Sequence, residues 1–280
     1  MMDQMIRTPY GQMPAYVAAP PAAGPWPGVV VIHDFAGMSH DLRNQADWLA
    51  GEGYLARLPH LYYWGSRLRC LRTIMREIAA GAGRTFDDID SVRGWLSRHD
   101  QCTGKIGVIG FCMGGAYAVA LAPGHGYSAA SVNYGGCPKD AERTLAGACP
   151  VVGSYGGEDR TPMGRSAAPR LEQALTALGV DHDVKVYPGA GHGSSAIPIP
   201  RTRPRCCSCW RSFPGPATTR HPRRTHAAAS PPFSASISRT ERRRGHRRAA
   251  ATPPRAHGRP RLSNGMQETR QIWSLCVMQP

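Results

Sequence analysis

Cys112 stands where a catalytic nucleophile would be expected in this sequence. It lies in the segment Gly-Phe-Cys-Met-Gly-Gly at residues 110–115, which follows an apolar run and precedes a run of small, helix-forming residues. This order predicts a strand, a sharp turn and a helix. Gly-x-Cys-x-Gly in such a turn is the pattern of a nucleophile elbow, with cysteine in the place of serine. The first N–H groups of the helix would face a substrate oxygen, and the positive end of the helix dipole favours a thiolate.

A carboxylate and a histidine follow the cysteine in the order that a catalytic triad requires. Glu158 and Asp159 come after an apolar run at residues 150–155, and His192 lies between two glycines after the run at 183–187. Nucleophile, acid and histidine, each on a loop after a strand, is the chain order of the α/β-hydrolase triad. The spacing alone leaves Glu158 and Asp159 as alternatives for the acid.

These residues also have an ordinary structural interpretation. Cysteine is among the most buried residue types and is most often inert, and a single loop histidine usually has no catalytic part. A free thiol with a pKa of about 8.5 is mostly protonated at neutral pH, so Cys112 would need activation. The flanking glycines and the order of the three motifs favour the catalytic interpretation.

The sequence resembles the dienelactone hydrolase family, the cysteine-nucleophile branch of the α/β hydrolases. The matching segments are the three motifs above, together with Gly-Val-Val-Val-Ile-His-Asp at residues 28–34 and Gly-Tyr-Leu-Ala-Arg-Leu-Pro at residues 53–59. The resemblance extends over about residues 10–193. It implies an α/β-hydrolase fold.

The resemblance also implies a Cys-His-Asp triad, with Cys112 as nucleophile, His192 as base and Asp159 as the carboxylate that orients the base. The backbone N–H groups of Phe35 and Met113 would form the oxyanion hole. The implied reaction is cleavage of a carboxylic ester or lactone, of the carboxymethylenebutenolidase type, through a thioester intermediate. The resemblance implies neither a metal nor another cofactor.

Asp34 occupies a position where the family usually has a glutamate. By the resemblance, this carboxylate holds the neutral thiol of Cys112 and takes its proton when substrate arrives. Aspartate is one methylene shorter than glutamate, so its reach to Cys112 is open. The alternative is a solvated loop aspartate.

The arginines of this chain depart from the family pattern. Family members that act on dienelactone bind its carboxylate with arginines, one of them shortly after the catalytic histidine, and residues 193–196 contain none. His60 stands where the family usually has an aspartate. A segment predicted as a helix or a lid carries four further arginines, which could make a cap contact but which we expect to form a solvated face: Arg67, Arg69, Arg72 and Arg76.

Alternating strand and helix patterns predict the α/β class, with a mostly parallel sheet and helices on both faces. Residues 29–32 form a β-branched run typical of a buried parallel strand, and residues 14–18 are expected at the sheet edge. Further strands are expected near residues 54–58, 106–109, 129–133, 151–155 and 184–187. Helices are expected near residues 41–49, 67–80, 85–96, 116–121 and 167–178. Active sites of such sheets lie at the carboxyl ends of the strands, where all three triad candidates fall.

Charge divides the chain close to residue 193. Residues 1–193 carry 17 basic and 17 acidic side chains, whereas residues 194–280 carry 17 arginines and only 2 glutamates. The whole net charge of +15 therefore belongs to the second part. We expect residues 1–193 to form one dienelactone hydrolase-like domain, and residues 194–280 to form an Arg/Pro-rich tail of low order, because few core-forming residues offset its charge.

The tail shows no pattern of the final amphipathic helix that the family places after its histidine loop, so we expect this helix to be missing. A tail rich in arginine and proline but without lysine is what a GC-rich gene yields in another reading frame, so we hypothesise a frameshift soon after residue 193. A spacing close to that of a zinc finger runs from Cys206 to His226, but the prolines within it would break the required helix. We therefore expect no metal site.

Three functional interpretations follow from these features. The first is a thiol esterase or lactonase, the second is a family member impaired by its altered C-terminus, and the third is a basic nucleic-acid-binding protein that uses the tail. We favour the first, with a small-molecule ester or lactone as substrate and no specific nucleic acid or membrane as partner. The chain shows neither a signal-peptide core nor a membrane-spanning apolar run, so we expect a cytoplasmic monomer with free cysteines.

Overall fold

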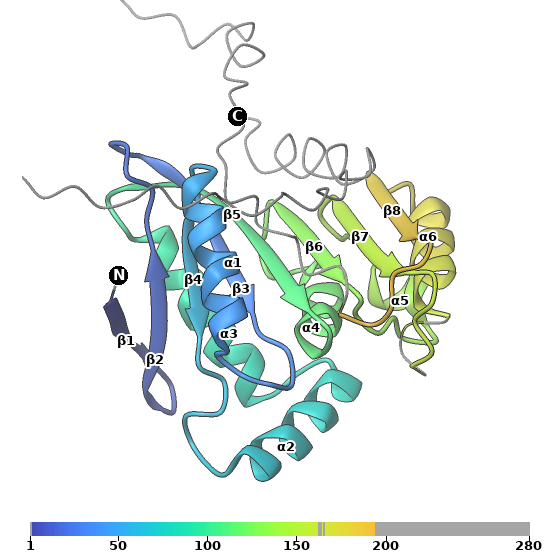
Figure 1. The fold of residues 1–280 in the computed structure, drawn as a ribbon, viewed down its shortest axis with the longest axis horizontal. Coiled ribbons are helices and arrows are strands. Elements are labelled where there is room, and N and C mark those ends of the chain that lie inside the picture. Colours follow the sequence, from blue (N-terminus) through green and yellow to red (C-terminus); the bar gives the residue numbers. More distant parts are fainter. Residues whose placement is uncertain (1, 162–163, 165, 194–280) are drawn as a thin grey trace, which may run out of the picture. The chain divides into compact units, whose positions relative to one another are not determined.

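The computed structural model describes residues 2–161, 164 and 166–193, which form an eight-stranded sheet flanked by helices (Figure 1). The strand order is β1-β2-β4-β3-β5-β6-β7-β8. β2 pairs antiparallel with both β1 and β4, whereas every pairing from β4 through β3 to β8 is parallel. This topology confirms the predicted α/β class with a mostly parallel sheet.

The elements of the described residues are bounded as follows. The strands are β1 Met2–Thr8, β2 Gly11–Ala18, β3 Trp26–Ile32, β4 Leu55–Pro59, β5 Cys102–Phe111, β6 Ala129–Asn133, β7 Val151–Gly156 and β8 His182–Tyr187. The helices are α1 His40–Gly51, α2 Arg67–Ala80, α3 Arg84–Ser97, α4 Met113–Leu121, α5 Ala141–Thr144 and α6 Ala167–Leu178. Each helix that the hydrophobic spacing predicts is therefore present, and α5 is an additional short one.

Helices cover both faces of the sheet. On one face, α1 packs Leu42, Ala46 and Leu49 into a cluster with Val29 and Val31 of β3. These helix residues recur at the spacing of one helical face, which is why α1 buries a single apolar stripe. On the opposite face, α3, α4 and α6 contribute to a larger apolar cluster. Figure 1 shows α1 in front of the sheet and α3 behind it.

The position predicted for residues 14–18 is wrong. They belong to β2, which lies between β1 and β4, so β1 and not β2 forms this edge of the sheet. β1 was missed because its sequence is largely polar and buries only alternate positions such as Ile6 and Thr8. Its pairing with β2 is a tertiary contact that the pattern of either segment alone does not reveal.

The predictions made for residues 194–280 lie outside the described residues. These are the low-order tail, the absent final helix, the altered reading frame and the spacing from Cys206 to His226. All described residues belong to one compact unit.

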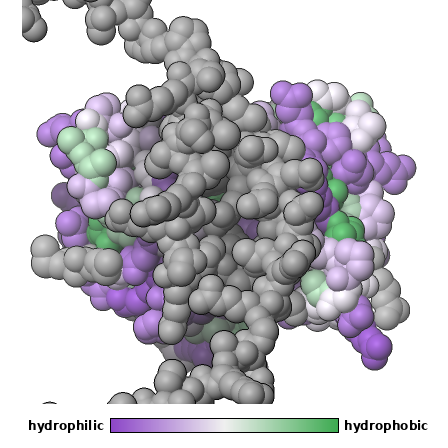
Figure 2. Space-filling view, turned by 45° about the horizontal axis from the view of Figure 1, so that its top comes forward, coloured by the Kyte–Doolittle hydropathy of each residue, from purple (hydrophilic) through white to green (hydrophobic). Residues whose placement is uncertain are grey.

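The described surface seen in Figure 2 is mostly hydrophilic, with hydrophobic residues in small separate groups. The large hydrophobic side chains that are exposed include Phe35 and Leu68, each more than half exposed. None of the helices within the described ranges combines the length and apolar character that a membrane crossing requires.

We expect Gly114→Ala to destabilise the fold by about 3 kcal/mol or more, because a Cβ at this position would overlap the backbone carbonyl of Ile32. Urea unfolding monitored by circular dichroism would measure the change. Gly51→Ala is the matched control, since this helical glycine has open space around it and should gain up to about 1 kcal/mol from the better helix former. Equal stability of the two variants would contradict the packing described here.

Candidate active site

The turn between β5 and α4 holds Cys112 in a strained backbone conformation. Cys112 has φ of 54° and ψ of −111°, a region that non-glycine residues seldom adopt. A Cβ at Gly110 would overlap the carbonyl of Gly114, and a Cβ at Gly115 would lie 2.7 Å from the Cα of Gly135. The glycines are therefore required because the elbow backbone touches itself and its neighbours, as the Gly-x-Cys-x-Gly pattern predicts.

Cys112, His192 and Asp159 lie in mutual contact. The Sγ of Cys112 is 3.1 Å from Nε2 of His192, and Nδ1 of His192 is 2.7 Å from Oδ2 of Asp159. The thiol and the carboxylate are both largely buried, at 8% and 4% exposure. The three motifs that the sequence placed in catalytic order therefore come together at one edge of the sheet.

The loops that carry the acid and the histidine are tied to each other. Glu158 donates its backbone N–H to the carbonyl of Ala190 at 2.9 Å, and Gly157 donates to that of Tyr187 at 2.9 Å. The second oxygen of Asp159 accepts the backbone N–H of Thr161 at 2.9 Å. The structure therefore separates the two acids that the spacing left open: the side chain of Asp159 contacts the imidazole, whereas Glu158 contacts this part of the site through its backbone N–H.

The ring of Tyr134 supports the imidazole from the side. Its centroid lies 5.0 Å from that of His192, in an edge-on arrangement with an interplanar angle of 73°. Tyr134 follows β6 and has a positive φ of 42°. Nothing in its local sequence marks it as a site residue, because its partner His192 lies far along the chain, on the loop after β8.

Burial controls the ionisation of the triad. Burial raises the pKa of the Cys112 thiol, the backbone N–H of Met113 lowers it, and the charges of Asp34 and Asp159 raise it further, so the net shift is upward. Burial alone would also raise the pKa of Asp159, but hydrogen bonds from His192 and Thr161 outweigh it and hold that pKa below its usual value. The resting site therefore pairs a neutral thiol with an ionised carboxylate.

The carboxylate of Asp34 bonds its own loop, whereas the resemblance implied a contact with the thiol of Cys112. Its Oδ1 accepts the backbone N–H of Ala36 at 2.7 Å, whereas the thiol of Cys112 faces His192. Burial raises the pKa of Asp34, and the N–H of Ala36 and the charge of Arg67 partly offset this effect. Asp34 thus acts on Cys112 through its charge, and the shorter aspartate side chain caps its own loop.

Three side chains hold the loop of Phe35: His33 and Tyr62, which no sequence pattern marked as site residues, and Arg67, which was expected on a solvated face. His33, wholly buried, donates from Nδ1 to the carbonyl of Asp34 at 2.6 Å. The Tyr62 hydroxyl donates to the carbonyl of Phe35 at 3.1 Å, and Arg67 donates to the same carbonyl from Nη2 at 2.7 Å and Nε at 3.1 Å. The solvated face predicted for the four arginines of α2 therefore does not describe Arg67, although it is exposed.

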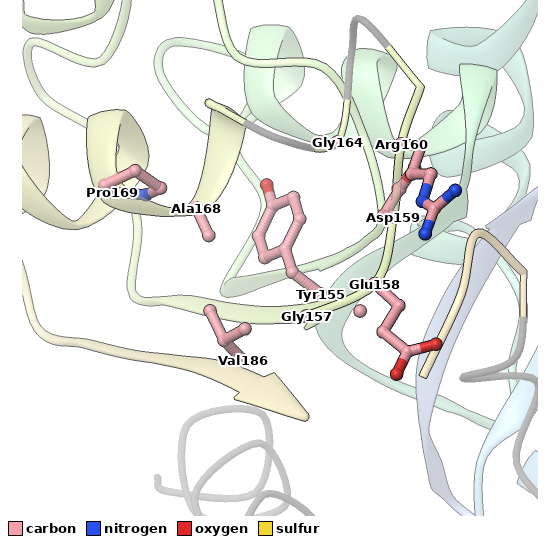
Figure 3. A pocket seen from close by; sticks show the side chains of 10 residues that line it. Tyr155, Gly157, Glu158, Asp159, Arg160, Gly164, Ala168, Pro169 and Val186 are labelled. Carbon is pink, nitrogen blue, oxygen red and sulfur yellow. The ribbon is translucent and has the colours of Figure 1, made fainter. Parts of the chain in front are cut away.

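A cavity of about 540 Å³ lies beside the acid loop (Figure 3). In Figure 3 the ring of Tyr155 stands between the start of α6 and the side chain of Arg160. The cavity is lined, among the described residues, by Tyr155, Gly156, Gly157, Glu158, Asp159, Arg160, Gly164, Ala168, Pro169 and Val186. Because neither Cys112 nor His192 contributes to this lining, the candidate reaction centre is the contact between those two residues and not this cavity.

No cluster of three or more histidine, cysteine, aspartate or glutamate side chains suited to a metal ion occurs within residues 2–161, 164 and 166–193. His60, the departure noted in the sequence, instead accepts the backbone N–H of Tyr62 on Nδ1 at 3.2 Å. It therefore shapes the loop after β4.

Comparison with known proteins identifies relatives of this chain. The model of the family described as "Dienelactone hydrolase family" matches residues 13–197. A "Putative carboxymethylenebutenolidase" of Yersinia pestis is 31% identical over 201 residues, covering 66% of this chain and 75% of the relative. The protein of the same description from Salmonella typhimurium is 31% identical over 202 residues, covering 66% and 74%. A crystal structure of a "Putative Dienelactone Hydrolase" from Klebsiella pneumoniae has a TM-score of 0.61 and 28% identity, covering 70% of this chain and 88% of that chain.

We expect alkylation of Cys112 by iodoacetamide to have a higher pH midpoint in the folded protein than in the urea-unfolded protein, because burial and two nearby carboxylates raise the pKa of this thiol. Asp34→Asn should lower that midpoint, since it removes one negative charge while keeping an oxygen that can accept the Ala36 N–H. Mass spectrometry of the peptide that contains Cys112 would follow the reaction. A midpoint below 7 in the unmodified protein would contradict the neutral resting thiol.

Proposed function

We propose that this chain, which belongs to the dienelactone hydrolase family, hydrolyses carboxylic esters or lactones through Cys112, His192 and Asp159. The observation that carries the proposal is the pair of contacts on the imidazole: 3.1 Å from Nε2 to the thiol and 2.7 Å from Nδ1 to a buried carboxylate. A base within hydrogen-bond reach of a nucleophile, and itself oriented by a third group, is the arrangement that nucleophilic catalysis needs. The carboxymethylenebutenolidase relatives support the ester or lactone class of substrate.

The first half of the reaction forms a thioester. Nε2 of His192 takes the thiol proton while the sulfur of Cys112 adds to the substrate carbonyl carbon. The N–H groups of Met113 and Phe35 stabilise the negative charge on the carbonyl oxygen. The tetrahedral adduct then breaks its C–O bond, and the leaving alkoxide takes the proton from His192. In a lactone the alcohol stays attached to the acyl group.

The second half releases the acid. His192 takes a proton from water as the water oxygen adds to the thioester carbonyl, and collapse of this adduct breaks the C–S bond. The proton on His192 returns to the departing sulfur, so the neutral thiol of Cys112 is restored. The ionised Asp159 stabilises the imidazolium in both halves, in line with its lowered pKa.

Asp34 has an electrostatic part in this proposal. Its negative charge disfavours a free thiolate at Cys112, so deprotonation is coupled to attack on a bound substrate. This part differs from direct proton transfer between Asp34 and the thiol, because the thiol of Cys112 faces His192 and the Oδ1 of Asp34 accepts the Ala36 N–H.

We expect the full chain to hydrolyse p-nitrophenyl acetate, and Cys112→Ala to lose at least about 10³-fold in kcat/KM. Asp159→Asn should lose at least about 10²-fold, since it removes the charge that stabilises the imidazolium. Release of p-nitrophenolate measures the rate, and an acetyl group on the Cys112 peptide after acid quenching would identify the thioester.

Cys102→Ala is the matched control, because this partly exposed cysteine lies at the start of β5, away from the imidazole. It should retain full activity. Equal turnover by the unmodified chain and Cys112→Ala would exclude Cys112 as the nucleophile. Absence of turnover in both would favour a family member impaired by its altered C-terminus.

A further inference from the structure

We propose that His33 and Arg67 are positioning residues that fix the oxyanion-binding N–H of Phe35, His33 through the carbonyl of Asp34 and Arg67 through the carbonyl of Phe35. This inference rests on the proposed function, since it concerns the oxyanion hole of the same reaction. It assigns a role to two side chains that do not touch the reacting thiol.

The first peptide of the loop is held by His33. Nδ1 of His33 donates to the carbonyl oxygen of Asp34 at 2.6 Å, and the backbone N–H of Gly37 donates to the same oxygen at 3.1 Å. In a trans peptide the C=O and the following N–H point in opposite directions. Holding the Asp34 oxygen toward the buried imidazole therefore turns the Phe35 N–H away from it. No acceptor for this N–H occurs among the described residues.

His33 can hold this orientation only as the neutral Nδ1–H tautomer. Its Nε2 accepts the backbone N–H of Leu61 at 3.2 Å, so a second proton there would oppose the Leu61 donor. Burial lowers the pKa of His33 to about 4, which keeps this tautomer over the ordinary pH range. The residue thereby links the loop after β3 to the loop after β4.

The second peptide is held by Arg67. Its Nε and Nη2 both donate to the Phe35 carbonyl, and the Tyr62 hydroxyl donates to it at 3.1 Å. With the carbonyls of Asp34 and Phe35 both held, the backbone dihedrals of Phe35 between them are fixed. The guanidinium comes from the first residue of α2, a helix that buries only Cys70 and Ile74.

The held loop lies against the elbow. The Tyr62 hydroxyl that contacts the Phe35 carbonyl also lies 3.8 Å from the Met113 sulfur, and a Cβ at Gly114 would come within 2.8 Å of the His33 carbonyl. Met113 supplies the second oxyanion donor at the start of α4, where the N–H groups have no partner within the helix. Fixing Phe35 therefore fixes one donor relative to the other, on which stabilisation of the oxyanion depends.

The test compares an aryl acetate with its thiono analogue, in which sulfur replaces the carbonyl oxygen and forms weaker hydrogen bonds with the oxyanion donors. For the acetate, Arg67→Met should lower kcat about 10-fold with KM within about twofold, since a whole oxyanion donor is worth about 10²–10³-fold. For the thiono ester, kcat should fall less, so kcat/KM for the acetate divided by kcat/KM for the thiono ester should be lower than in the unmodified protein. Arg67→Lys, which keeps the charge but not the paired donors, should recover only part of the loss.

Arg72→Met is the matched control, because Arg72 lies exposed on the same helix and its loss removes the same charge. It should leave both substrates unchanged. For His33, the variant His33→Asn keeps a donor for the Asp34 carbonyl, whereas His33→Val does not. Both should keep a native circular dichroism spectrum. The ratio of kcat/KM for the acetate to kcat/KM for the thiono ester should be lower in His33→Val than in His33→Asn. Because Arg67 is exposed, its variants test the inference even where the His33 variants fail to fold.

Equal losses on the two esters in Arg67→Met, or no loss on either, would overturn the inference while Cys112-dependent turnover still supported the proposed function. Turnover that Cys112→Ala leaves unchanged would instead overturn the proposed function itself. The two failures are thus separate results of the same set of assays.

Discussion

Contact between the sulfur of Cys112 and the imidazole of His192 depends on how closely the elbow backbone approaches its neighbours. Gly110, Gly114 and Gly115 each lie where a Cβ would overlap or crowd the backbone of α4, β3 or the loop after β6. This approach holds the thiol at the carboxyl edge of the sheet in a positive-φ conformation. In this position the thiol lies 3.1 Å from Nε2 of His192.

The electrostatics of the site follow from the same close packing. The thiol is buried beside two carboxylates, so its pKa rises, whereas Asp159 gains enough hydrogen bonds for its pKa to fall. A neutral nucleophile within hydrogen-bond reach of an oriented base suits attack on a carbonyl that is already bound, because proton transfer and bond formation can then occur together. The exposed Arg67 and the buried His33 act on the backbone of the facing loop and leave the thiol itself untouched.

Several elements of the fold and site were predictable because each depends on a local sequence pattern. The β-branched run of β3, the helical spacing of α1 and the glycines around Cys112 each need only a short stretch of sequence to be recognised. The failures share one cause, which is dependence on a partner far along the chain. β1 is a strand because it pairs with β2. Arg67 is held by hydrogen bonds to the carbonyl of Phe35, 32 residues earlier in the chain. Asp34 is a different case: its reach to the thiol was left open, and its side chain accepts the N–H of Ala36, only two residues away.

The sequence by itself determined the chemical groups and their order: a cysteine in an elbow, a carboxylate and a histidine, each at the end of a strand. Periodicity and glycine placement are local consequences of backbone geometry, so they can be read without coordinates. Only the tertiary structure decided that His33 and Arg67 hold the loop of Phe35, and that the imidazole touches Asp159, the acid that the resemblance had implied and that the spacing alone could not separate from Glu158. These choices depend on distances of about 3 Å between segments remote in sequence, which packing sets and no local pattern encodes.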